Sequence, residues 1–315
     1  MLELMNLSLR MKQDDRLLVD NFSFTLQRGD KAVVIGEEGN GKSTLLKAIY
    51  DRSLVEGYCD CTGTVTARGK KAYLPQSMDE ALFDRTLADY FDGAAFYEHT
   101  DVLSHFGLTA AFLFSDRKLG TLSGGEKVKV QLCRLLMDDP DILLLDEPTN
   151  DLDIETLEWL EGFLQSTRLS VLYISHDETL IENTANVIVH MEQLIRKTRC
   201  RVTVSREGYR EYLARRKRQF THQDQVARKQ RDDYAKQMRR WQQIHDRVEH
   251  EQRSNSRQDP HSGRLLKKKM HAVQSTGKRL EREKEAFLDF SEEEDAILTR
   301  FDPGVTVPAG KVVLD

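Results

Sequence analysis

Two stretches of this chain carry residue types that bind phosphate and activate water. Gly36-Glu-Glu-Gly-Asn-Gly-Lys-Ser-Thr44 has the spacing of a phosphate-binding loop, with glycines that turn backbone amides inward, a positive charge at Lys42 and a hydroxyl for Mg²⁺ at Ser43. The apolar run from Ile142 ends in two carboxylates, Asp146 and Glu147. Asp146 would orient the ligands of Mg²⁺, and Glu147 would polarise an attacking water as a general base. The two stretches predict phosphoryl chemistry on a nucleotide.

The sequence around these motifs predicts alternating strands and helices. Lys31 to Ile35 is a short apolar run that enters the Gly-rich loop, and Lys42 to Tyr50 has the pattern of a helix that begins in it. Such a helix directs its positive end at phosphate. Ile142 to Leu145 and Val171 to Ile174 have the length and composition of buried parallel strands. We therefore predict an α/β domain over residues 1–205.

Three shorter motifs say little when each is taken alone. Leu122-Ser-Gly-Gly-Glu126 leaves the amides of two glycines exposed, and a helix expected from about Glu126 would favour an anion at its N-terminus. His176, in Ser175-His-Asp177, follows a predicted strand, where a lone histidine is usually a polar cap. Gln76 ends the stretch Ala72-Tyr-Leu-Pro-Gln76.

The order of all these motifs resembles the ATP-binding cassette (ABC) superfamily. The resemblance implies a P-loop fold with a helical subdomain in Asp79 to Leu119, and hydrolysis of ATP with Mg²⁺ between two cassettes held face to face. His176 would contact the γ-phosphate, Gln76 would sense Mg²⁺ and the attacking water, and Asn150 to Asp153 would cross to the opposing cassette. The expected catalytic residues are Glu147, His176 and Gln76, and the expected Mg²⁺ ligands are Ser43, Gln76 and Asp146. The expected nucleotide-binding residues are Gly36, Gly39, Asn40, Gly41, Lys42, Ser43, Thr44, Ser123, Gly124 and Gly125.

The chain departs from the family at the nucleobase. ABC proteins usually place an aromatic residue ahead of the loop to stack on adenine, and Leu9 to Asp15 has none. Phe22 and Phe24 alternate in a predicted strand and are expected in the core. Stacking by Arg10 or Met11 is the open alternative.

The second half of the chain changes in character. Residues 206–284 hold 23 Lys and Arg against 11 Asp and Glu, a net charge of +12, whereas the rest of the chain carries −17. Apolar residues recur about every 3.5 positions on either side of a polar break at 255–263, which predicts an antiparallel helical hairpin over residues 206–300. Gly277 and Lys284 interrupt the second seam. The seam residues are Tyr234, Met238, Trp241, Ile244 and Val248, then Leu266, Met270, Val273, Leu280 and Phe287.

A basic hairpin after the cassette resembles the ABC-F proteins, whose two cassettes are joined by a charged helical linker and which bind the ribosome. The resemblance implies contact with ribosomal RNA through Arg253 to Lys269, and coupling of this contact to cassette closure. It implies a second cassette, either from a homodimer or from a missing C-terminal half, of which residues 301–315 would be the start. Antibiotic protection of the ribosome and general translation control are both open.

Other interpretations compete with this one. The cassette alone would suit the ATPase subunit of a membrane transporter, or a truncated regulator that binds ATP without hydrolysing it. The charged hairpin could be a solvated arm that serves only solubility.

Composition narrows the cellular setting. Four cysteines, with Cys59 and Cys61 near a Gly-rich stretch, form neither a disulfide framework nor a set with zinc spacing, which fits a reducing cytoplasm. The sequence has no signal peptide pattern and no apolar run near the roughly 20 residues that span a bilayer. We therefore expect no membrane insertion.

Overall fold

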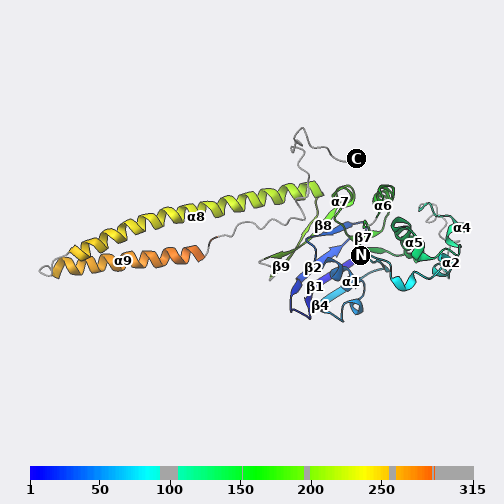
Figure 1. Ribbon diagram of the computed structural model, residues 1–315, viewed down its shortest axis with the longest axis horizontal. Helices are drawn as coiled ribbons and strands as arrows, with labels where there is room; N and C mark the ends of the chain where they lie inside the picture. Colours follow the sequence, from blue (N-terminus) through cyan, green and yellow to red (C-terminus); the bar gives the residue numbers. More distant parts are fainter. Residues whose placement is uncertain (93–105, 151, 195–198, 255–259, 286, 288–315) are drawn as a thin grey trace, which may run out of the picture. The chain divides into compact units, whose positions relative to one another are not determined.

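The computed structural model describes all residues except 93–105, 151, 195–198, 255–259, 286 and 288–315 (Figure 1). The described residues divide into two units, one within Met1–Tyr212 and one within Leu213–Glu293. Helix α8 (Tyr209–Ser254) begins in the first unit and continues into the second. The predicted start of a second cassette at 301–315 lies outside the described residues. The predicted domain boundary at 205 and 206 stays a prediction.

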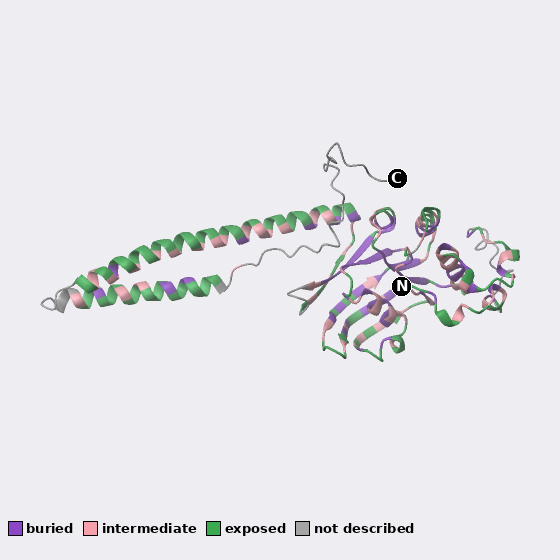
Figure 2. Cartoon of the chain, in the orientation of Figure 1, coloured by how far each residue is buried: buried purple, intermediate pink, exposed green. Residues whose placement is uncertain are grey.

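A largely parallel sheet runs through the first unit. Among the described residues it has six strands, and only the pair β8–β9 is antiparallel. Three neighbouring central strands are buried at every residue, as parallel strands covered on both faces should be, and Figure 2 shows this burial in purple. The strand order is β5 (Lys71–Leu74), β6 (Ile142–Asp146), β7 (Ser170–Ile174), β3 (Lys31–Ile35), β8 (Val187–Leu194) and β9 (Arg199–Ser205). The predicted strands at β3, β6 and β7 are confirmed.

An antiparallel sheet packs against this layer. Its described strands are ordered β2 (Leu17–Leu26), β1 (Leu2–Met11) and β4 (Cys59–Ala67). Its inward side chains join those of β3, β6 and β7 and of helix α1 (Lys42–Tyr50) in one hydrophobic core. Phe22 and Phe24 lie in this core, as predicted. Cys59 and Cys61 lie on β4, where burial raises the pKa of both thiols.

Three longer helices of the first unit are capped by side chains. Ser123 caps α5 (Gly124–Leu136), Asp153 caps α6 (Ile154–Ser166) and Asp177 caps α7 (Glu178–Thr184). Helix α5 begins two residues before the position expected from the sequence, because Ser123 and Glu126 form a reciprocal capping box. The shorter described helices are η1 (Arg52–Leu54), η2 (Glu80–Leu82), α2 (Leu87–Tyr90), α4 (Ala110–Leu113) and η3 (Leu119–Thr121).

The second unit is the predicted antiparallel hairpin of α8 and α9 (Pro260–Glu285). The Trp241 indole donates to the carbonyl of Val273 at 2.7 Å. A Cβ at Gly277 would lie 2.9 Å from the Trp241 ring, so the glycine makes room for the indole. Gly277 is therefore part of the packing between the two helices and does not interrupt it. Ile244, predicted in the seam, is 52% exposed, whereas the neighbouring His245 is half-buried.

Candidate functional site

Four parallel strands bring the predicted site residues to one edge of the sheet. Strands β5, β6, β7 and β3 are neighbours and run in the same direction, so the loops that follow them converge. Gln76 follows β5, Glu147 follows β6, His176 follows β7 and Gly36 follows β3. The sheet order therefore explains why residues spread over 140 positions share one site.

The phosphate loop has the backbone that anion binding requires. Gly36, Gly39 and Gly41 have φ values of 145°, 76° and 90°, which glycine adopts without strain. The buried Lys42 donates from Nζ to the carbonyl of Gly36 at 2.7 Å and to that of Glu37 at 2.9 Å. Helix α1 begins here, with Gly41 at its N-cap and no side-chain cap. Its first-turn amides, including that of Thr44, are therefore available to bind an anion held by the loop.

Asp146 is held by two hydroxyl groups. Ser43 Oγ donates to Oδ1 at 2.8 Å, and the Tyr73 hydroxyl donates to Oδ2 at 2.9 Å. The carboxyl is 1% exposed, and burial raises its pKa. A buried carboxylate beside a serine hydroxyl is a set of hard oxygen ligands, which fits Mg²⁺. The ion's charge would offset the cost of burying this group.

Glu147 is the meeting point of the predicted catalytic residues. Gln76 Nε2 donates to Oε2 at 3.1 Å, Asn150 Nδ2 donates to the same oxygen at 2.8 Å, and His176 Nε2 lies 3.7 Å from Oε1. Burial, together with the charge of Lys42, lowers the pKa of His176, and Glu147 opposes this shift. The Glu147 backbone has φ of 48°, a left-handed conformation that a non-glycine residue rarely adopts and that is common at active sites.

The Ser-Gly-Gly motif has contacts of its own. The Ser123 hydroxyl accepts from the Glu126 amide at 3.2 Å, and the Glu126 carboxylate pairs with Arg117 at 2.9 Å. A Cβ at Gly125 would lie 2.5 Å from the Thr156 hydroxyl, so α5 approaches α6 closely there. These contacts are with the motif's own helix and its neighbours, and the predicted role of the motif at the nucleotide of another cassette stays a prediction.

The loop after β6 continues into α6. Asp153 accepts from the Thr156 amide at 2.8 Å, and its hydrogen bonds with Thr156 lower its pKa. Asn150 turns back to Glu147. The predicted crossing of this loop to an opposing cassette stays a prediction, and residue 151 lies outside the described residues.

None of the four residues considered for adenine stacking, Arg10, Met11, Phe22 and Phe24, presents an exposed aromatic ring. Phe22 and Phe24 are buried and stack on each other, with ring centroids 6.0 Å apart. Arg10 pairs with Asp15 at 3.2 Å, and Met11 packs partly against the core.

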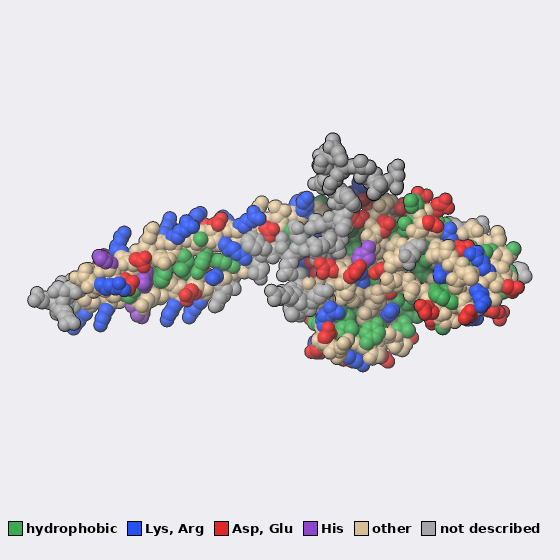
Figure 3. Space-filling model, viewed as in Figure 1, with side chains coloured by type: hydrophobic (Ala, Val, Ile, Leu, Met, Phe, Trp, Pro, Cys, Tyr) green, Lys and Arg blue, Asp and Glu red, His purple; other side chains and the backbone are tan. Residues whose placement is uncertain are grey.

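The hairpin carries a strongly basic surface. Figure 3 shows Lys and Arg side chains, in blue, along its length. Five of the six predicted RNA-binding cations have described and exposed side chains, namely Arg253, Arg264, Lys267, Lys268 and Lys269. Arg253 pairs with Glu249 at 2.5 Å, and Lys269 lies 3.9 Å from Glu251. Arg257 and the side chain of His261 lie outside the described part of the chain.

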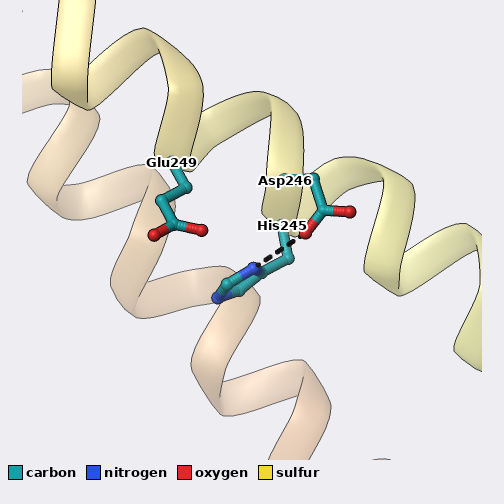
Figure 4. Close-up of side chains that lie close together, drawn as sticks. All are labelled: His245, Asp246 and Glu249. Carbon is teal, nitrogen blue, oxygen red and sulfur yellow. Dashed lines mark hydrogen bonds and ion pairs between the residues drawn. The ribbon is translucent and has the colours of Figure 1, made fainter.

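One group on α8 has the residue types of a metal site. The ligand atoms of His245, Asp246 and Glu249 all lie within 4.8 Å of one another (Figure 4). All three come from one helix, however, and Arg253 already binds the Glu249 carboxylate. The positive charges of the surrounding Lys and Arg side chains also disfavour binding of a metal cation here. We assign this group to the ordinary polar contacts of the helix surface.

Two contacts at the site were missed by the sequence analysis. Tyr73 was seen only as part of the stretch before Gln76, yet it orients Asp146. Asn40 is predicted to bind nucleotide, which stays a prediction, and its side-chain Nδ2 donates to the Met191 carbonyl on β8 at 3.0 Å. Alternation along β5 could have placed Tyr73 on the side of the sheet that faces α1. No local signal marks the partner of Asn40.

Comparison with known proteins supports an ATP-binding cassette fold. The family model described as ABC transporter matches residues 19–150. A bacterial Atm1-family ABC exporter with ATP bound is similar over 68% of this chain and 40% of its own, with a TM-score of 0.54 and 22% identity. Ribosome-bound archaeal Pelota and ABCE1 gives a TM-score of 0.53 at 23% identity, over 66% of this chain and 35% of that one. At this level of identity the two structures support the fold alone. No described helix is long and apolar enough to cross a membrane.

The curated relatives indicate particular branches of the ATP-binding cassette proteins. Ribosome protection protein VmlR of Bacillus subtilis is 34% identical over 55% of this chain and 31% of its own length. A probable ATP-binding cassette sub-family F member 3 homolog of Encephalitozoon cuniculi is 34% identical over 61% and 30%, and tylosin resistance ATP-binding protein TlrC of Streptomyces fradiae is 31% identical over 64% and 44%. The chain thus spans less than half the length of each. Motif order, family match and relatives together identify an ATP-binding cassette domain in this chain, and the curated relatives include a sub-family F member.

Proposed function

We propose that this chain binds MgATP, hydrolyses it as one cassette of a two-cassette assembly, and couples closure of that assembly to ribosome binding through its hairpin. The observation that carries the proposal is the convergence of Gln76, Asn150 and His176 on the carboxylate of Glu147, beside the phosphate loop. A solvated acid at a strand end would not need partners from its own loop and from two neighbouring loops.

Binding would use the loop and the start of α1. Lys42 and the first-turn amides of α1 would hold the phosphates, and Lys42 is kept in the loop by its two carbonyl contacts. Ser43, Asp146 and Gln76 would hold Mg²⁺, which supplies neutralisation of charge on the phosphate oxygens. The Tyr73 hydroxyl fixes the second oxygen of Asp146, so that the first remains beside Ser43.

Hydrolysis would depend on Glu147 and His176. Glu147 accepts hydrogen bonds that orient its carboxylate, and it would polarise the attacking water. Burial and Lys42 lower the pKa of His176, which favours a neutral imidazole whose N–H would donate to the γ-phosphate. Ser123, Gly124 and Gly125 would complete the site of a second cassette, provided by a homodimer or by a further part of a longer protein.

The ribosome is the partner that the relatives favour. Their names include a ribosome protection protein, a tylosin resistance ATP-binding protein and elongation factor 3, whereas the transporter alternative has support only from the fold and the broad family model. The exposed cations from Arg253 to Lys269 would bind rRNA phosphates. Such a role places the protein in the cytoplasm. Antibiotic protection and general translation control would use this same arrangement and differ at the hairpin tip, residues 254–263.

Co-sedimentation with ribosomes tests this function. The chain carrying Glu147→Gln, which should bind ATP without hydrolysing it, is expected to sediment with ribosomes in MgATP and to remain in the supernatant without nucleotide. Glu158→Gln on exposed α6 is the matched control and should show no trapped complex. Equal sedimentation with and without ATP would reject the coupling, and co-purification with a membrane-spanning protein would favour the transporter alternative.

A further inference from the structure

Strand β8 lies directly beside the phosphate loop. Its residue His190 pairs in parallel register with Ile35, the last residue before the loop. Within the loop, the buried Asn40 donates to the carbonyl of Met191, and a Cβ on Gly36 would lie only 2.2 Å from that carbonyl oxygen. The backbone of the loop therefore cannot shift at Gly36 or Asn40 without acting on Met191.

The neighbouring residue on β8 connects to the first turn of α8. His190 Nδ1 and the Tyr212 hydroxyl are 2.6 Å apart, and their rings meet edge to face with centroids 6.0 Å apart. The two side chains are 0% and 3% exposed. A hydrogen bond so far from water is costly to leave unmade, since neither group finds water in exchange. All of these residues belong to the unit Met1–Tyr212.

A second attachment joins α8 to the loop that carries His176. Arg210 pairs with Glu182 of α7, and α7 is capped by Asp177, the residue after His176. Arg210 is 74% exposed and Glu182 24% exposed, so water and salt screen this ion pair. Of the two attachments, the buried one between His190 and Tyr212 should hold α8 more firmly.

We propose that the His190–Tyr212 contact is the joint through which nucleotide binding at the phosphate loop changes the first turn of α8, and so positions the hairpin. The inference rests on the proposed ATP binding, and it names the residues through which that binding would affect the hairpin. In this role Tyr212 is a positioning residue. It touches no nucleotide, and it acts through β8, from Met191 to His190.

Hydrogen exchange of the amides at residues 209–216 tests this route. The chain would carry Glu147→Gln and be measured with and without MgATP. Tyr212→Phe removes the hydroxyl and keeps the ring against His190, and Tyr234→Phe, further along α8, is the matched control. A second variant, Arg210→Gln, removes the exposed pair. ATP affinity is measured separately with a fluorescent ATP analogue.

MgATP is expected to slow exchange at residues 209–216 by about fivefold in the reference chain, the size of one buried hydrogen bond. In Tyr212→Phe this response should fall below about 1.5-fold on the same scale, while ATP affinity changes less than about twofold. Tyr234→Phe and Arg210→Gln should keep the response. A full response in Tyr212→Phe, or none in a reference chain that binds ATP, would overturn the joint. Failure of the reference chain to bind ATP would instead overturn the proposed function.

Discussion

Gln76 donates a hydrogen bond from its side-chain nitrogen to Oε2 of Glu147, at 3.1 Å. The two residues follow β5 and β6, which are paired in parallel from Lys71 and Ile142 to Leu74 and Leu145. Their loops therefore leave the sheet side by side. A displacement of the loop after β5 changes the direction of the Glu147 carboxylate, so an expected sensor of Mg²⁺ is connected directly to the expected general base.

Replacement of Glu147 by Gln should separate binding from hydrolysis. The amide keeps the size of the side chain but cannot take a proton from water, so turnover should fall by roughly 10²- to 10⁴-fold. ATP affinity should change little, because Lys42 and the loop amides are untouched. Phosphate release and equilibrium nucleotide binding measure the two quantities. A parallel loss of both would remove Glu147 from the role of base.

Asp146→Asn should stabilise the chain while impairing its Mg²⁺ site. Burial raises the pKa of Asp146 in the folded state, so the stability that this group contributes is complete below its unfolded pKa near 3.8 and is lost as pH rises through the folded value. At pH 7 without Mg²⁺, the variant should gain about 1 kcal/mol in free energy of unfolding by urea, and the gain should shrink towards pH 4. Asp20→Asn, on an exposed site, is the control. Lower stability of the variant at pH 7 would contradict this account.

Gly277→Ala should weaken the hairpin although alanine favours helix. A Cβ at 277 would lie 2.9 Å from the rigid Trp241 ring, whereas one at Gly162, in exposed α6, has no atom within 4 Å. Gly162→Ala should therefore stabilise its helix by about 0.5–1 kcal/mol, and Gly277→Ala should destabilise by roughly 1–3 kcal/mol. Urea unfolding followed by Trp fluorescence compares them. Equal gains in both variants would show that the indole yields at no cost.

Charge reversal of Lys267, Lys268 and Lys269 to Glu should weaken RNA association and leave ATP binding unchanged. These exposed cations would contact phosphates, so their loss should also reduce the slope of log affinity against log salt by about 2 to 3. Reversal of Lys236, Arg239 and Arg240, exposed on α8, is the control with equal charge. Binding of labelled rRNA measures both. Equal effects of the two triple variants would indicate attraction by net charge rather than by the hairpin tip.

The strands that position the candidate site could be predicted from the sequence because they have local signals, whereas the roles of the site residues stay predictions. The apolar runs that became β3, β6 and β7 end at the phosphate loop, at Glu147 and before His176, and their burial follows from composition alone. The hairpin followed from apolar periodicity and a polar break. Within it, the exposure of Ile244 was not predicted, because the rotation of the helix about its axis is not decided by a spacing of 3.5 or 3.6.

Contacts between distant residues were beyond those patterns. Tyr73 meets Asp146, Asn40 meets Met191 and His190 meets Tyr212 only because β5, β8 and α8 take particular places in the fold. Gly277 is another such residue. Glycine within a helix is normally read as destabilising, and only the position of Trp241 on the facing helix shows that a side chain at 277 would not fit.

The length of α8 gives weight to events at its beginning. Its 46 residues form one continuous helix, which at 1.5 Å per residue extends about 70 Å from Tyr209 to Ser254. A tilt of only about 5° at the start of such a helix displaces its far end by roughly 6 Å. This distance is close to the rise of two base pairs, at about 3.4 Å each. Sub-ångström adjustments near Tyr212 would thereby be amplified into displacements that a large RNA surface can register.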